Sequence, residues 1–301
     1  MTSPEIAIIG DIHGQWTSFD TEYFNQSDYS VILLTGDLAR WIDGTPTARA
    51  LKSLNKPVFL IPGNHDGITL PQFLAEFKNI PSLCEFFGRK MEKRMMVLGE
   101  AMGPRAHAGG YRLHTLEGLS AKPGLITARP HSMGGNRMYF RPYLRQKFGV
   151  DSLQDSVDLL KKLIDQAPEQ LIFLGHNGPH GLGSQPQDLW GCDFSTQYGD
   201  FGDKDLELAI AYARASGRQV LAVIAGHMHH ALKRQTSERD WWIRQHNTLY
   251  LNPAKVPRIF KQEGRKWHHH LALALNPEVD AHQVWVCPDG STRRFSANSI
   301  S

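Results

Sequence analysis

The sequence predicts an α/β fold built around a parallel β-sheet. Three short apolar segments, residues 5–9, 29–34 and 58–61, alternate with helix-like segments at residues 16–24 and 47–54. Runs of four to six β-prone residues bounded by glycine are typical of buried strands. Strands that alternate with helices form parallel sheets with right-handed crossovers, so we expect such a sheet in the first third of the chain.

The middle of the chain carries fewer signals. Residues 71–77 favour a helix, whereas Val97, Leu98 and residues 111–116 favour strands. Residues 153–164 carry apolar side chains every three or four positions, which predicts an amphipathic helix.

Two further strands and one helix follow. We expect strands at residues 171–174 and 220–225, and between them a helix over residues 205–216 that begins near Asp203. After Lys233 the pattern changes to short strands without long helices, and we expect an antiparallel edge or a second sheet from residues 248–251, 258–260, 270–275 and 283–286. Residues from Ser296 onward read as a frayed tail.

Composition limits the class of protein. A chain of 301 residues accommodates one domain, 1–301, with an insertion at about 99–150 that shapes the substrate site. The net charge of +3 gives no reason to expect nucleic-acid binding. Three cysteines without a CxxC pair, no leader pattern and no bilayer-length apolar run favour a soluble cytoplasmic protein without a membrane partner. The oligomeric state stays open.

Five of the predicted strands share one feature: a glycine and then metal-binding side chains follow the apolar run. Ligands collect beyond the carboxyl ends of strands in α/β sheets, so we expect these side chains to converge. The candidate ligands are Asp11, His13, Asp37, Asn64, His176, His227 and His229.

The spacing within these groups suggests individual roles. Asp11 and His13 would point the same way from an extended backbone, because side chains alternate between faces. Asp37 is the natural candidate for a carboxylate that bridges two ions. His65 follows a ligand without being needed as one, so it is free to give a proton to a leaving oxygen.

The ligand types indicate which metals to expect. Histidine nitrogen, carboxylate and amide oxygen without thiolate suit manganese or iron, with zinc as an alternative, rather than calcium. Seven ligands exceed the needs of one ion. We therefore expect two ions about 3.5–4 Å apart, the spacing used for displacement at phosphorus.

Other polar residues have competing interpretations. Residues 128–137 form either an ordinary exposed loop or a lid in which Arg129, His131 and Arg137 clamp a phosphate. The histidine run 268–270 reads as a strand edge, and His230 as a residue pointing away from His229.

The motifs together resemble the signature of the calcineurin-like metallophosphoesterases. They occur in order over residues 11–229, as Asp11-x-His13, Gly36-Asp37, Gly63-Asn64-His65-Asp66, Gly175-His176 and Gly226-His227-x-His229. The resemblance implies a four-layer αββα sandwich, in which two β-sheets are flanked by helices.

The resemblance also implies a division of the ligands. One ion would be held by Asp11, His13 and His229, the other by Asn64, His176 and His227, with Asp37 bridging. A hydroxide between the ions would attack phosphorus in line while His65 protonates the leaving alkoxide. Catalysis would then fall to His65 and Asp37, and the substrate would be contacted by Asn64, Arg40, Arg129 and His131.

The chain departs from the Ser/Thr protein phosphatases of this superfamily. Those carry Gly-Asp-x-Val-Asp-Arg-Gly and Gly-Asn-His-Glu, where this chain has Gly36-Asp37-Leu38-Ala39-Arg40-Trp41 and Asp66. Arg40 stands where the acid supporting the catalytic histidine would be, which argues against phosphoprotein substrates. Residues 128–135, 176–179 and 199–203 are similar to a branch found in cyanobacteria and plastids, and that similarity names no substrate.

We therefore expect a dinuclear-metal hydrolase of small phosphate esters, with phosphomonoesters ahead of cyclic-nucleotide or other diesters. A non-catalytic binding or scaffold protein on the same fold is the main alternative, because fold does not fix function. A histidine-carboxylate iron oxygenase would leave several of the ligands unexplained.

Overall fold

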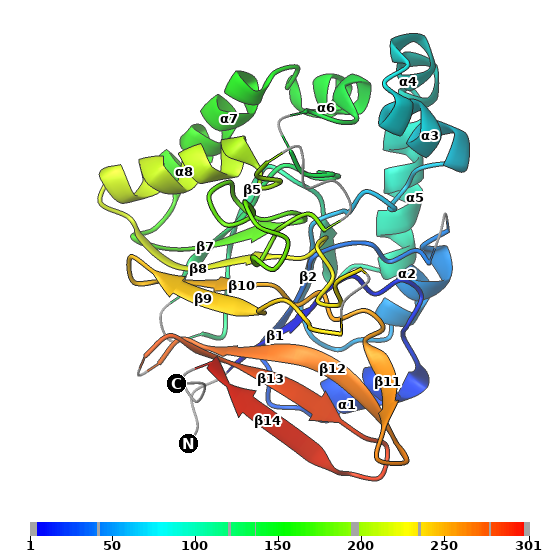
Figure 1. The fold of residues 1–301 in the computed structure, drawn as a ribbon, viewed down its shortest axis with the longest axis vertical. Coiled ribbons are helices and arrows are strands. Elements are labelled where there is room, and N and C mark those ends of the chain that lie inside the picture. The colour runs from blue at the N-terminus through cyan, green and yellow to red at the C-terminus, as the bar shows by residue number, and fades with distance from the viewer. Residues whose placement is uncertain are drawn as a thin grey trace.

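The computed structural model describes residues 5–40, 43–119, 122–135, 137–193, 199–233, 236–276 and 278–297. Trp41, Asn136 and the predicted tail beyond residue 297 lie outside these ranges. Two β-sheets lie face to face with helices on their outer sides (Figure 1).

The first sheet joins the beginning of the chain to its end. Its strand order is β14 (Thr292–Ser296), β13 (Asp280–Val286), β12 (Arg265–Ala274), β1 (Ile6–Ile9), β2 (Val31–Leu34), β3 (Val58–Leu60) and β4 (Ala106–Ala108), with β11 (Ile259–Gln262) on β12. Strands β1 to β4 are parallel, and β11 to β14 pair antiparallel. The parallel start and the antiparallel end are both confirmed.

The second sheet is also mixed. Its order is β5 (Arg112–Thr115), β6 (Gly124–Thr127), β7 (Gln170–Gly175), β8 (Gln219–Ala225), β10 (Thr248–Leu251) and β9 (Trp242–Gln245). The four inner strands are parallel, and antiparallel strands close both edges.

The side chains of β1 show how the layers form. Ile6 and Ile8 pack in the core between the two sheets, whereas Ala7 and Ile9 face the outer core of the first sheet. This alternation is expected for a strand buried on both faces. The outer core is covered by α1 (Ser18–Gln26) and α2 (Thr45–Leu51), and the second sheet by α7 (Leu153–Gln166) and α8 (Lys204–Ala215). The fold is the predicted αββα sandwich.

Helix starts follow from capping chemistry. The hydroxyl of Ser152 accepts the amide hydrogen of Asp155 at 3.1 Å, and the Asp155 carboxylate accepts that of Ser152 at 2.9 Å. Thr17 and Asp20 form the equivalent box at α1. Both pairs satisfy amides that helix geometry leaves open.

The predicted strand at Val97 and Leu98 is wrong. Three helices occupy this region: α3 (Leu70–Lys78), α4 (Pro81–Gly88) and α5 (Met91–Met102). Met91, Leu98 and Met102 are buried on one side of α5 while Val97 is exposed, so the spacing is helical. Two adjacent apolar residues are too few to distinguish a strand from a helix.

Residues 99–150 lie within the sandwich as well as on it. They supply β4 to the first sheet, β5 and β6 to the second, and α6 (Arg141–Phe148) on the surface. Their role in shaping a substrate site stays a prediction. Among the described residues, no helix has the length and apolar character needed to cross a membrane.

Candidate metal centre

The predicted ligands meet where the two sheets meet. Strands β1, β2 and β3 run parallel in one sheet and β7 and β8 in the other, so each sheet delivers its carboxyl ends to one edge. Several contacts join these edges, and two of them involve backbone groups. The Nδ1 atom of His176 lies 2.6 Å from the carbonyl oxygen of Thr35, and the amide of His227 donates to Oδ2 of Asp11 at 3.0 Å.

Three ligands form a first group. One atom each from Asp11, His13 and His229 lies within 4.8 Å of the others. The Nε2 atoms of His13 and His229 are 3.2 Å apart, and Nε2 of His229 is 3.3 Å from Oδ2 of Asp11. Residues 216 positions apart in sequence are thus brought together.

A second group lies beside it. Nε2 of His176 is 2.8 Å from Oδ1 of Asn64, and the rings of His176 and His227 are 5.0 Å apart between centroids. His176 and Asn64 are both buried.

Asp37 lies between the two groups. Its Oδ2 atom is 3.8 Å from Nε2 of His13 in the first group and 3.8 Å from Nε2 of His176 in the second. A carboxylate equidistant from a residue of each group is placed to be shared by them.

The orientation of the imidazoles fits cation binding. Nδ1 of His13 lies 3.1 Å from the carbonyl oxygen of Ala39, and Nδ1 of His176 faces that of Thr35. A carbonyl requires the hydrogen on Nδ1, so a neutral ring presents the Nε2 lone pair inward. These lone pairs then face other acceptors, His229 nitrogen and Asn64 oxygen. Acceptors that converge in this way suit a metal ion between them.

The backbone at the site is not extended, contrary to the alternation argument for Asp11 and His13. Asp11, His13, Asp37 and His227 have φ values of 37°, 45°, 51° and 66°. The amide of His13 donates to the Asp37 carbonyl at 2.7 Å and holds this turn. Left-handed non-glycine residues cost roughly 1–3 kcal/mol each and cluster at functional sites.

Two glycines are required by close approach. A Cβ atom on Gly63 would lie 2.2 Å from Oδ1 of Asp37, and one on Gly226 would lie 2.2 Å from Oδ1 of Asp11. The glycine that precedes these ligands therefore makes room for a carboxylate from another strand end.

Asp66 holds the backbone of the turn that carries Asp37. It is fully buried, and its two oxygens accept amide hydrogens from Asp37 at 2.8 Å, Leu38 at 2.9 Å and Gly63 at 2.9 Å. Burial and the nearby charge of Asp37 raise the pKa of Asp66 to about 6. Its position in the motif was noted from the sequence, but these partners were not predictable.

Thr35 was missed by the sequence analysis. Its hydroxyl donates to Oδ1 of Asp11 at 3.2 Å, and its carbonyl receives His176. The available signal was a hydroxyl residue at the end of an apolar strand, directly before Gly36.

The site concentrates charge of both signs. Burial alone would raise the pKa of Asp11 and Asp37, but the surrounding histidines outweigh it and both pKa values lie below the ordinary one. Burial and the charge of His176 lower the pKa of His227 to about 3. For His176 burial is outweighed by Asp37 and Asp11, and its pKa is raised.

His65 stands next to the ligands. Its ring is 5.6 Å from that of His13 and stacks on Phe73 at 5.5 Å. Its side chain is half-buried.

The predicted substrate contacts lie in different settings. Arg40 is exposed beside Gly14. Arg129 is only 2% exposed and pairs with Asp203 at 2.9 Å and Asp205 at 2.8 Å. His131 is buried, with Nδ1 2.7 Å from the Gly63 carbonyl, and burial lowers its pKa to about 3. The expectation of an ordinary exposed loop is wrong for residues 128–132, which are buried against the site.

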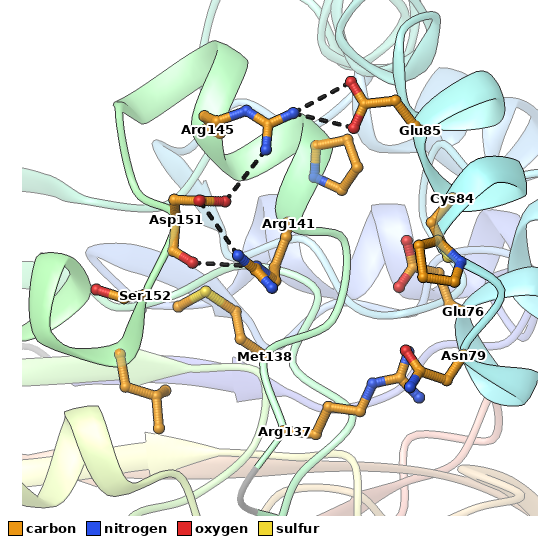
Figure 2. A pocket seen from close by; sticks show the side chains of 13 residues that line it. Glu76, Asn79, Cys84, Glu85, Arg137, Met138, Arg141, Arg145, Asp151 and Ser152 are labelled. Atoms are coloured by element: carbon orange, nitrogen blue, oxygen red, sulfur yellow. Dashed lines mark hydrogen bonds and ion pairs between the residues drawn. The ribbon is translucent and has the colours of Figure 1, made fainter.

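A separate cavity lies between α4 and α6. It has a volume of about 660 Å³, and Figure 2 shows Arg145 between Glu85 and Asp151, with Arg141 also paired to Asp151. Arg137 packs on Tyr139 at 4.5 Å. None of the predicted metal ligands lines this cavity.

One histidine interpretation needs correction. His268, His269 and His270 are buried within β12, which has partners on both sides, and are not at a sheet edge. His230 is buried too, with Nε2 2.8 Å from the carbonyl of Asn252.

Histidines, carboxylates and an amide gathered at the strand ends of an αββα sandwich are a donor set that suits a metal-dependent hydrolase. The chain belongs to the calcineurin-like phosphoesterase family, which it matches over residues 4–231. It is therefore a metallophosphoesterase, an enzyme that hydrolyses phosphoric esters, of a family that generally uses a dinuclear metal centre.

Solved structures give distant similarities. An archaeal phosphodiesterase shares 12% identity with a TM-score of 0.39, over 97% of this chain and 99% of that one. An anchor protein of the inner membrane complex of Plasmodium shares 13% sequence identity with a TM-score of 0.44, over 98% of this chain and 89% of that one. A predicted phosphoesterase from Streptococcus pneumoniae shares 9% sequence identity with a TM-score of 0.35, over 98% of this chain and 99% of that one. No curated protein matches the sequence.

Proposed function

We propose that this protein hydrolyses small phosphomonoesters with two metal ions. The observation that carries the proposal is the position of Asp37, whose Oδ2 lies 3.8 Å from a histidine of each ligand group. A single-ion site would have no use for a carboxylate shared in this way.

The ligands divide by proximity. Asp11, His13 and His229 would hold one ion and Asn64, His176 and His227 the other, with Asp37 common to both. Manganese and iron suit this donor set best, with zinc as the alternative. When bound, the ions would neutralise phosphate charge and lower the pKa of a water molecule in the site.

His65 would act on the leaving group. Its ring stands beside His13 without belonging to either ligand group. A histidine in this position can give a proton to the departing oxygen. Asn64, the neighbour of His65 in the same turn and a proposed ligand of the second ion, would also orient the phosphate.

Arg40 would contribute the positive charge that favours a monoester dianion. It is the exposed member of the predicted substrate contacts and lies beside Gly14, one residue after a ligand. His131 would act on the substrate through the Gly63 turn, whose carbonyl it contacts. Arg129 would act through the buried loop that its pairs with Asp203 and Asp205 hold in place. Phosphodiesters are the second candidate.

The test compares an aryl phosphate with its bis ester, using protein loaded with manganese. We expect faster release from the monoester, and loss of activity by at least about a hundredfold in Asp37→Asn and His65→Ala, since acid–base catalysis alone contributes that much. His246→Ala and Asp289→Asn change exposed residues and serve as matched controls.

Two outcomes would change the proposal. A preference for the bis ester would assign a phosphodiesterase. Wild type and variants that are equally inert over a broad phosphoester panel would favour the non-catalytic scaffold. We also propose a cytoplasmic location, supported by three buried cysteines without disulfides.

A further inference from the structure

Helices α3, α4 and α5 carry an apolar surface that the metal centre does not explain. They project together at one corner of the molecule (Figure 1). Of the ten large apolar side chains that are exposed in the described residues, eight belong to this segment: Leu70, Leu74, Phe77, Ile80, Leu83, Phe86, Met96 and Val97. Such a concentration marks an interaction surface, whereas single exposed apolar residues do not.

The exposure on α3 is systematic. Leu70, Leu74 and Phe77 recur at helical spacing on one face, and Phe77 is 63% exposed. The opposite face, with Gln72 and Glu76, is buried against the protein. An ordinary surface helix has the reverse arrangement, with its apolar face inward.

The two following helices also expose large apolar side chains. On α4 the buried residue is Cys84, while Leu83 and Phe86 face outward and Phe86 is 64% exposed. On α5 Met96 and Val97 are exposed and lie opposite the buried side. Three consecutive helices therefore present apolar side chains to solvent.

The same segment carries four exposed cations. Lys78, Arg89, Lys90 and Lys93 are exposed, and none forms an ion pair with a carboxylate in the described ranges. Two acids of the same helices are neutralised, Glu85 by Arg145 at 2.9 Å and Glu92 by Lys147 at 2.6 Å. Glu100 is exposed at the far end of α5. The excess positive charge fits an anionic partner.

A row of rings connects this surface to the metal centre. His13 contacts His65 at 5.6 Å, His65 stacks on Phe73 at 5.5 Å, and Phe73 stacks on Phe77 at 6.5 Å. A partner seated on α3 would therefore lie next to the candidate proton donor.

We propose that the outer faces of α3, α4 and α5 dock the protein on an anionic lipid surface. The apolar side chains enter the boundary between headgroups and acyl chains, and the unpaired cations contact the headgroups. A second copy fits less well, since it would bring four more unpaired cations against the first four. The inference revises the expectation of no membrane partner, and it holds whether or not the site is catalytic.

The test is co-sedimentation of the full chain with vesicles, which needs no turnover. We expect the protein to bind vesicles made of equal parts of phosphatidylcholine and phosphatidylglycerol, and to bind vesicles of phosphatidylcholine alone only weakly. Phe77→Ser with Phe86→Ser should weaken binding by at least about tenfold, given the area these rings bury. Lys90→Gln should weaken it by about fivefold, the effect of one cation near such a surface.

The control is Leu208→Ser with Phe295→Ser, on α8 and β14, which are the two large exposed apolar residues of the described ranges that lie outside the α3–α5 segment. We expect this variant to bind as wild type does. Thermal melting of both double variants confirms that they are folded. The proposal is overturned if the protein binds neither kind of vesicle, or if the control variant loses as much binding as the Phe77→Ser, Phe86→Ser variant. It is also overturned if the protein forms a concentration-dependent dimer that the Phe77→Ser, Phe86→Ser variant abolishes.

Discussion

The backbone amide of His65 donates a 2.9 Å hydrogen bond to Oδ1 of Asp37. The other oxygen of the same carboxylate faces His13 and His176. One side chain therefore fixes the turn that carries the candidate proton donor and also lies between both ligand groups. Disturbing Asp37 should affect metal binding and the position of His65 together.

The first prediction concerns the support of Asp37. Asp66→Asn replaces an oxygen that accepts amide hydrogens with an NH₂ group that cannot, and leaves buried donors without a partner. We expect a loss on the order of 2 kcal/mol in unfolding free energy, together with weaker metal affinity. Urea unfolding and a metal titration measure the two effects. Unchanged affinity would show that Asp66 is not needed to position Asp37.

The second prediction concerns close packing at Gly63. Gly63→Ala would place a methyl group 2.2 Å from Oδ1 of Asp37, so the turn must move. We expect manganese affinity to fall by at least about tenfold, as it does when a supporting residue around a metal is lost. Gly99→Ala in α5 meets nothing within 4 Å and should be neutral or stabilising by up to about 1 kcal/mol. Equal affinity in the two variants would contradict the packing argument.

The third prediction concerns Arg129. Arg129→Met would leave Asp203 and Asp205 buried without their cation, which costs about 3–5 kcal/mol. Arg141→Met removes an exposed pair with Asp151 and should cost less than about 1 kcal/mol. Chemical denaturation of both variants tests this. A stable Arg129→Met protein with a raised KM would instead support direct substrate contact.

The fourth prediction concerns pH. Burial lowers the pKa of His270 from 6.5 to about 3, so the unfolded chain binds a proton in this interval that the folded protein does not. The unfolding free energy therefore has its full value, as far as His270 is concerned, above about pH 6.5. It falls by on the order of a few kcal/mol as the pH falls toward 3. Unfolding free energies measured across this range should fall less steeply in His270→Phe than in wild type. The exposed control His246→Asn should keep the wild-type slope, and an unchanged slope in His270→Phe would refute the assignment.

The strand ends were predictable because two independent signals coincide there. Buried parallel strands read as short apolar runs, and ligands such as His176 and His227 follow them directly. The extended backbone expected for Asp11 and His13 is wrong, because a left-handed turn bound to the Asp37 backbone brings these two residues together.

Tertiary contacts decided what the sequence left hidden. Leu98 belongs to a helix of twelve residues whose buried apolar residues are Met91, Leu98 and Met102, and the two adjacent residues Val97 and Leu98 do not show this spacing. His270 is buried, and the hydroxyl of Tyr29, which lies just before β2 and 241 residues away, is 2.8 Å from its Nε2. Arg129 appeared available to phosphate only because its partners Asp203 and Asp205 lie far along the chain.

Metal content measured after loading with manganese and removal of the excess tests the account most directly. We expect two ions for each wild-type chain and fewer in Asp37→Asn, with Asp289→Asn retaining both. A wild-type protein that holds no ion, or an Asp37→Asn protein that holds as many as wild type, would contradict a shared carboxylate between two metals.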